Sequence, residues 1–169
     1  MNLFRRIGRR IYINSRNLLI KVLSSNIDIG SNLNYRSCFR INCDDGGHLT
    51  IGDNVFFNND CSINVHNNVE IGNNCIFGEG VKIYDHNHIF NVSDTPIYKQ
   101  GFSNKEVRIG SNCWIGSNVV ILPGTNIGEN SVIGAGAVIN GKIPENCIVV
   151  PNRDYKLNAI KYRSKTDVN

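Results

Sequence analysis

The chain has 169 residues, of which 41% are hydrophobic and 19% are charged. This composition excludes a disordered chain, and the lack of an uninterrupted apolar run of about 18 residues argues against a membrane-spanning helix. The length suggests one domain, large enough to bury a core without disulfide bonds. The chain contains 27 Asn, 23 Ile and 16 Gly but only one Met and one Trp. Such a composition favours strands and turns over helices.

Residues 1–26 form a short basic segment that we expect to be helical. The net charge of the chain is +4, and the first 27 residues contain no acid. The basic residues of this segment are Arg5, Arg6, Arg9, Arg10, Arg16 and Lys21. The pattern is typical of a solvated helix face, and it also suits contact with an anionic membrane surface. A mitochondrial transit peptide has a similar composition, whereas the apolar core of a secretory signal is missing.

A six-residue period dominates the chain after residue 27. Its clearest run is six isoleucines, each six residues from the last: Ile109, Ile115, Ile121, Ile127, Ile133 and Ile139. Weaker runs begin at Ile29, Ile51 and Ile71, and glycine follows each of these three. The spacing slips by two residues between Ile63 and Ile71. We therefore expect two extra residues to bulge out near Asn67 and Asn68.

A six-residue period matches neither the 3.6-residue period of an α-helix nor the two-residue alternation of a long β-strand. It indicates a solenoid of short strands and turns. Three hexapeptides would make one triangular coil, so each isoleucine would stack on the one 18 residues later, about 4.8 Å along the axis. Glycine and asparagine would occupy the turns. Cys61, Cys75 and Cys113 fall at a small inward position and are expected to be packing residues. The six cysteines include no CxxC pair, so we expect reduced thiols and a cytoplasmic location.

The repeat is interrupted between Ile83 and Val107. Residues 85–106 lack the six-residue period and are too long for a turn. A long loop inside a regular repeat is usually functional. It begins with His86 and His88, two of the four histidines in the chain. Composition alone favours solvated histidines, but the surrounding repeat favours a catalytic role.

The tract VRIGSNCWIGSNVVILPGTNIGENSVIGAGAVI at 107–139 resembles the hexapeptide-repeat acyltransferases, and among them the maltose and galactoside O-acetyltransferases. The resemblance covers residues 27–150. It implies an all-β, left-handed parallel β-helix with the loop 85–106 inserted and a C-terminal tail at 151–169. The left-handed sense is implied by the resemblance alone, because parallel crossovers are normally right-handed. The resemblance also implies a homotrimer with active sites between subunits.

The resemblance assigns the role of general base to His88, with His86 as the second choice. A sugar hydroxyl attacks a thioester poorly while it is protonated, and an imidazole that titrates near neutrality can take its proton as the new bond forms. Asn58 corresponds to a family asparagine that faces the histidine and that can orient the imidazole or bind a sugar hydroxyl. Its alternative interpretation is an ordinary turn residue.

Substrate and cofactor contacts follow from the same resemblance. Trp114 would form a wall beside the acyl site, and we assign Asp85 to the acceptor as well. The backbone N–H of Ser117 would stabilise the oxyanion of the tetrahedral intermediate. Ala135 and Gly136 match the turn along which the pantetheine arm lies. The cations available for the nucleotide phosphates are Lys142, Arg153 and Lys156, and the choice among them stays open.

These features predict an acetyl-CoA-dependent O-acetyltransferase that modifies a sugar hydroxyl of a bacterial surface-polysaccharide precursor. It would be cytoplasmic or located at the inner face of the membrane, with no metal and no nucleic-acid partner. One alternative is a γ-carbonic-anhydrase-like enzyme, in which three histidines converge on zinc. The four histidines suffice by number, but the spacing of the loop pair does not match. The other alternative is a non-catalytic β-helix that serves as an assembly module.

Overall fold

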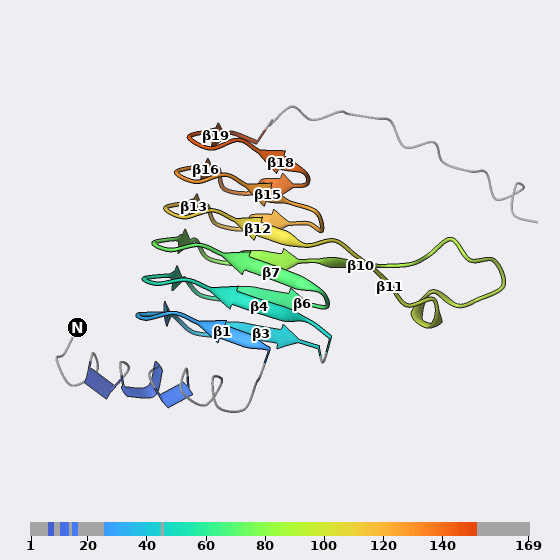
Figure 1. The fold of residues 1–169 in the computed structure, drawn as a ribbon, viewed down its shortest axis with the longest axis horizontal. Coiled ribbons are helices and arrows are strands. Elements are labelled where there is room, and N and C mark those ends of the chain that lie inside the picture. The colour runs from blue at the N-terminus through green and yellow to red at the C-terminus, as the bar shows by residue number, and fades with distance from the viewer. Residues whose placement is uncertain (1–6, 9–10, 14, 17–25, 45, 152–169) are drawn as a thin grey trace, which may run out of the picture.

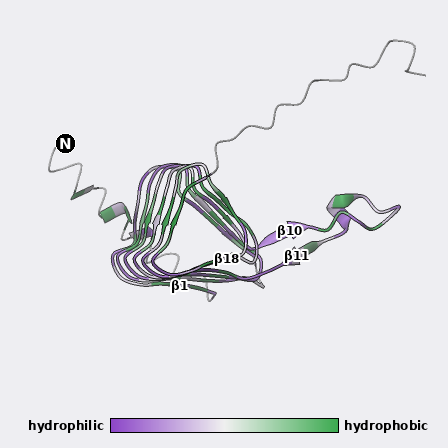
Figure 2. Ribbon diagram, turned by 90° about the horizontal axis from the view of Figure 1, so that it is seen from above, coloured by the Kyte–Doolittle hydropathy of each residue, from purple (hydrophilic) through white to green (hydrophobic). Residues whose placement is uncertain are grey.

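The protein is a β-solenoid with a projecting arm (Figure 1). The computed structural model describes residues 7–8, 11–13, 15–16, 26–44 and 46–151. Short strands from successive coils pair in parallel and build three sheets, which form the three sides of a triangular prism (Figure 2). The predicted all-β, parallel β-helix is thereby confirmed.

The three sheets, here named A, B and C, alternate along the chain. Sheet A contains β1 (Ile27–Ile29), β4 (His48–Ile51), β7 (Asn68–Ile71), β12 (Val107–Ile109), β15 (Asn126–Ile127) and β18 (Lys142–Ile143). Sheet B contains β2 (Asn34–Tyr35), β5 (Phe56–Phe57), β8 (Ile76–Phe77), β13 (Trp114–Ile115), β16 (Val132–Ile133) and β19 (Ile148–Val149). Sheet C contains β3 (Arg40–Cys43), β6 (Ser62–Val65), β9 (Lys82–Tyr84), β14 (Val120–Ile121) and β17 (Val138–Ile139).

The isoleucine repeat forms the core, as predicted. Ile109 pairs with Ile127, Ile115 with Ile133 and Ile121 with Ile139, each 18 residues apart. These side chains are buried. Stacking of equivalent residues thus creates one continuous apolar column per sheet, and no coil could bury its own column alone. Cys61, Cys75 and Cys113 are also buried, at the packing positions predicted for them.

Asparagine explains the sharp turns between sheets A and B. Six asparagines occupy the same corner of successive coils with φ between 56° and 59°: Asn32, Asn54, Asn74, Asn112, Asn130 and Asn146. Asparagine tolerates this left-handed conformation better than most residues. Their amides also bond from coil to coil, as from Asn54 Nδ2 to Asn74 Oδ1 at 3.1 Å. In five of these six turns a glycine two positions earlier leaves room for the next coil, since a Cβ on Gly72 would lie 2.6 Å from the Ser111 nitrogen.

The described residues of the basic N-terminal segment contact the first coil. Residues 7–8, 11–13 and 15–16 are helical, as expected. Ile13 is buried in the core cluster, and Arg16 donates to the Phe39 carbonyl at 3.1 Å while its guanidinium lies over the Tyr35 ring. Ile13 and Arg16 therefore pack against the first coil. Most of its basic residues lie outside the described residues. Within the described part of the chain, no helix has the length and apolar character needed to cross a membrane.

The interruption at 85–106 is a hairpin arm. The sequence predicts a long loop here, and the structure adds an antiparallel ribbon of β10 (His86–His88) and β11 (Phe102–Asn104), with the 3-10 turn η1 (Ile97–Lys99) near its tip. Figures 1 and 2 show the arm leaving the solenoid where sheet C gives way to sheet A. The two histidines thus lie on a defined strand at the base of the arm.

Candidate active site

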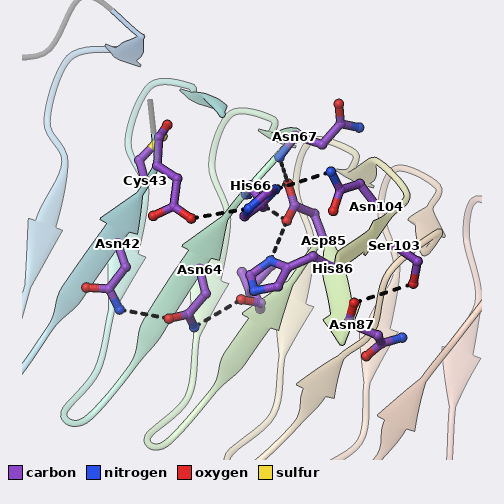
Figure 3. Close-up of polar contacts among 12 residues, drawn as sticks. Asn42, Cys43, Asn64, His66, Asn67, Asp85, His86, Asn87, Ser103 and Asn104 are labelled. Atoms are coloured by element: carbon purple, nitrogen blue, oxygen red, sulfur yellow. Dashed lines mark hydrogen bonds and ion pairs between the residues drawn. The ribbon is translucent and has the colours of Figure 1, made fainter. Parts of the chain in front are cut away.

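A buried carboxylate organises the corner between sheets C and A. Asp85 follows β9 and occupies an inward position, where its side chain is 0% exposed. Its carboxylate accepts bonds from the backbone N–H groups of His66, at 2.9 and 3.1 Å, and Asn67, at 2.7 Å. It also contacts His86 Nδ1 at 2.9 Å (Figure 3). Several donors therefore satisfy the buried charge, as a desolvated carboxylate requires.

This geometry corrects the assignment of Asp85 to acceptor binding. The carboxylate is sealed from solvent and already bonded to donors of its own chain. It holds the two-residue bend at His66 and Asn67. The predicted bulge is absent, because β6 and β7 are four residues long and take up the two extra residues, and Asn68 already belongs to β7. Asp85 therefore acts on the shape of the corner and on the His86 ring.

His86 has a defined tautomer. Because an ionised carboxylate only accepts, the Nδ1 atom of His86 carries the proton that it shares with Asp85. The Nε2 atom then carries a lone pair. The ring packs at 5.3 Å from the His66 ring and edge-on against Phe102 at 5.1 Å. Its side chain is 20% exposed, so Nε2 lies at the margin of the protein.

His88 lies two residues further along β10 and therefore projects on the same side of the strand. It is exposed, and its ring packs on Phe102 at a centroid distance of 4.5 Å. Phe102 is its register partner on β11. Both imidazoles thus flank one aromatic ring at the base of the arm.

His66 completes this cluster from the preceding coil. Asn104 Nδ2 lies 3.2 Å from His66 Nδ1, and Asp44 Oδ2 lies 3.6 Å from His66 Nε2. The His66 ring packs on Phe102 at 4.6 Å. Sequence reasoning did not include Phe102 or Asn104 in the site, because neither lies in a repeat or a recognisable motif. The ribbon register, which pairs His86 with Asn104, brings them there.

A second group of predicted residues lies on sheet B and at its corner with sheet C. Trp114 projects outward from β13 and is 57% exposed. Asn58 follows β5 at the corner, where its Oδ1 accepts from the Asn59 backbone N–H at 2.9 Å. Ala135 and Gly136 form the equivalent corner three coils later, and Gly136 has a φ of 76° with open space beside its Cα.

Ser117 lies at this same corner. Its carbonyl accepts from Gly136 N–H at 2.8 Å, whereas its own N–H has no hydrogen-bond partner among the described residues. Three coils earlier, the equivalent N–H belongs to Ser37, and it donates to the side chain of Asn59 in the next coil. In the coil after Ser117 the equivalent residue is Ala135, whose side chain offers no acceptor to the Ser117 N–H. Ser117 therefore presents a free backbone donor.

The predicted residues thus form two groups at different corners of one prism. Asp85, His86 and His88 lie at the corner between sheets C and A, while Asn58, Trp114 and Ser117 lie on sheet B or at its corner with C. Lys142 begins β18 on sheet A and is exposed. Arg153 and Lys156 lie outside the described residues. Among the residues that the structure describes, no group of three His, Cys, Asp or Glu side chains could hold a metal ion.

Comparisons with known proteins agree with this architecture. Residues 106–141 match the family model described as bacterial transferase hexapeptide (six repeats). The chain is 34% identical over 149 residues to a putative lipopolysaccharide biosynthesis O-acetyl transferase of Escherichia coli, WbbJ, covering 83% of this chain and 74% of the relative. The chain belongs to the hexapeptide-repeat acetyltransferases. The predicted family is therefore confirmed.

Solved hexapeptide-repeat acetyltransferases share the fold over most of their length. A maltose O-acetyltransferase from Clostridium difficile is 29% identical, with a TM-score of 0.66 and coverage of 92% of this chain and 88% of the other. An acetyltransferase from Vibrio cholerae, solved with acetyl coenzyme A, is 26% identical with a TM-score of 0.64, covering 88% and 78%. Two other relatives are each 38% identical, a probable acetyltransferase of Mycobacterium tuberculosis and a putative acetyltransferase of Saccharomyces cerevisiae, and the chain spans only 35% and 64% of their lengths.

Proposed function

We propose that this protein transfers an acetyl group from acetyl-CoA to a hydroxyl of a saccharide that serves as a surface-polysaccharide precursor. The family membership and the acetyl-CoA complex of a similar enzyme support the reaction class. The name of the Escherichia coli relative supports the acceptor class. The observation that carries the proposal is the pair of imidazoles, His86 and His88, on one side of β10 at the margin of the solenoid.

In the proposed reaction, His88 is the general base because it is the more exposed of the two imidazoles. His88 takes the proton of the acceptor hydroxyl while the oxygen attacks the thioester carbonyl. The resulting oxyanion accepts a hydrogen bond from the free N–H of Ser117. The C–S bond then breaks, the thiolate of coenzyme A leaves, and the imidazolium returns the proton to it. General-base action of this kind contributes about 10²–10⁴-fold to the rate.

We propose that the active site forms between copies in a homotrimer. The base and the oxyanion donor lie at different corners of one prism, so a single chain does not bring them together. Packing the corner that carries Asn58 and Ser117 against the histidine corner of a neighbour would do so. Sheet B also presents an outward apolar column, in which Ile76, Trp114 and Ile148 are 53%, 57% and 73% exposed. Covering such a column favours assembly.

We further propose a cytoplasmic location in which the basic N-terminal segment contacts the inner face of the membrane. The six basic residues before position 27 supply the positive charge for anionic lipid headgroups. Co-sedimentation with vesicles that contain anionic lipid, compared with neutral vesicles, tests this contact. Equal binding to both would argue against it.

Turnover of acetyl-CoA tests the proposed reaction. Release of coenzyme A is measured with a panel of monosaccharides, nucleotide sugars and oligosaccharides, and binding of acetyl-CoA is measured separately by calorimetry. We expect saturable binding and saccharide-dependent release. A folded protein that binds no acetyl-CoA would contradict the reaction class. Binding without turnover on any saccharide would contradict the acceptor class.

A further inference from the structure

His66 and His86 carry opposite tautomers. The carboxylate of Asp85 is an acceptor, so the His86 proton is on Nδ1 and its Nε2 carries a lone pair. The amide nitrogen of Asn104 is a donor, so His66 Nδ1 accepts its bond at 3.2 Å and the His66 proton is on Nε2. One ring therefore presents a hydrogen-bond acceptor and the other presents a donor.

Neither of these two nitrogen atoms has a hydrogen-bond partner among the described residues. His66 Nε2 lies 3.6 Å from Asp44 Oδ2, which is within ion-pair range but beyond hydrogen-bonding distance. His86 Nε2 is directed away from Asp85, because Nδ1 is the atom bound to it. The side chains are 29% and 20% exposed, so a ligand can reach both while most of each ring stays packed.

The two rings lie beside each other and beside one apolar surface. Their centroids are 5.3 Å apart, and each packs on Phe102, at 4.6 and 5.1 Å. Phe102 itself is 38% exposed. A donor, an acceptor and an aromatic ring side by side match a saccharide, whose neighbouring hydroxyls both donate and accept and whose C–H groups pack on aromatic rings.

We propose that His66 and His86 recognise a pair of neighbouring hydroxyls on the acceptor. One hydroxyl donates to His86 Nε2, and the adjacent hydroxyl accepts from His66 Nε2–H. The inference rests on the proposed function and adds the two residues that select the acceptor. Asp85 and Asn104 are positioning residues, because they set the two tautomers without contacting the saccharide.

Deoxy analogues test each contact separately. The probes are the methyl glycosides of galactose, glucose and mannose, together with their monodeoxy forms, and kcat/KM is measured for wild type, His66→Phe and His86→Phe. Phenylalanine keeps a ring in the aromatic cluster while it removes both nitrogens. Losing a hydroxyl that is bound in the site should lower wild-type kcat/KM by about 10–100-fold.

The expected pattern is reciprocal. Removing the hydroxyl that donates to His86 should lower kcat/KM in wild type and in His66→Phe but hardly change it in His86→Phe. Removing the adjacent hydroxyl should lower kcat/KM in wild type and in His86→Phe but hardly change it in His66→Phe. His48→Phe is the matched control, since His48 also pairs with a carboxylate, Asp28, at 3.3 Å, but lies on sheet A. Identical deoxy penalties in wild type and in both ring variants would overturn the proposal while leaving acetyl transfer intact.

A second measurement does not depend on turnover. Nitrogen-15 NMR of the free protein at a pH where the imidazoles are neutral reports which ring nitrogen carries the proton. We expect Nδ1–H for His86 and Nε2–H for His66. The same tautomer in both rings would overturn the donor–acceptor pair. Expected tautomers without turnover on any saccharide would instead contradict the proposed function.

Discussion

Asp85 and the two arm histidines show how one residue can define the site without contacting a substrate. Asp85 is fully buried and bonded to two backbone N–H groups and to His86. His88, two residues further on, lies on β10 with its ring against Phe102. In the proposed reaction the first imidazole is therefore oriented for recognition, and the second meets the reacting hydroxyl.

Substitution of His88 by alanine should remove most acetyl transfer. The side chain is exposed on the arm and contributes nothing to the isoleucine core, so folding and acetyl-CoA affinity should be retained. The demand for the base arises in the transition state, so kcat should fall by roughly 10²–10⁴-fold. Steady-state kinetics and calorimetry check this. Near-normal turnover by His88→Ala together with an inactive His86→Ala would move the base to His86.

Substitution of Asp85 by alanine should destabilise the protein. It leaves the N–H groups of His66 and Asn67 without their acceptor inside the corner. We expect the free energy of unfolding to drop by roughly 2–5 kcal/mol, measured by urea denaturation. Asp28→Ala is the control, because its carboxylate is 72% exposed and should change stability by less than about 0.5 kcal/mol. Equal effects of the two substitutions would contradict the buried-carboxylate account.

The site residues that could be predicted from the sequence are those that interrupt the six-residue repeat. His86 and His88 stand out because the six-residue period stops there. The burial of Asp85 could not be predicted, because inward positions are expected to be apolar and the donors that satisfy it come from a turn 18 or more residues earlier. Phe102 and Asn104 join the cluster only through the ribbon register.

At the scale of elements, the coils were predictable and the arm was not. At the corner between sheets A and B, isoleucine, glycine and asparagine at fixed positions specify an inward column, a close approach and a left-handed turn. The arm has no such period. Its order comes from ribbon pairing and from Gln100, whose side-chain amide bonds to the backbone of Val92 and Thr95 across the tip.

Substitution of a buried cysteine tests whether its thiol contributes only to packing of the coils. Cys113 is 2% exposed, and its thiol donates to the Gly128 carbonyl of the next coil at 3.3 Å. Cys113→Ala should therefore cost on the order of 1 kcal/mol of stability through lost packing, with kcat unchanged. Denaturation and turnover assays check both. Cys38→Ala is the exposed control and should change neither quantity. Loss of most turnover in a stably folded Cys113→Ala protein would show that the site has been misassigned.

At the scale of the whole molecule, the separation of the two groups of residues predicts that sites are shared between copies. Neither His88→Ala nor Asn58→Ala should be active alone. Unfolding and refolding an equal mixture should restore activity, because some sites would join an intact histidine corner to an intact Asn58 corner. With random assembly into rings, about a quarter of the wild-type activity should return.

The assembly itself is checked by sedimentation. Wild type and the mixture should both behave as trimers. Two variants refolded separately and then combined give the control, since intact trimers that do not exchange subunits should stay inactive. A stable monomer with full activity, or a refolded mixture without activity, would contradict a site shared between subunits.

The most direct test of the whole account is to follow the acetyl group itself. Acetyl-CoA with an isotopically labelled acetyl group is incubated with the protein and the saccharide panel, and the products are analysed by mass spectrometry. We expect a saccharide that is heavier by one labelled acetyl group and whose ester is cleaved by mild base, with little product from His88→Ala. Label that remains on acetyl-CoA, or that appears only as free acetate, in the presence of a folded protein that binds acetyl-CoA would contradict it.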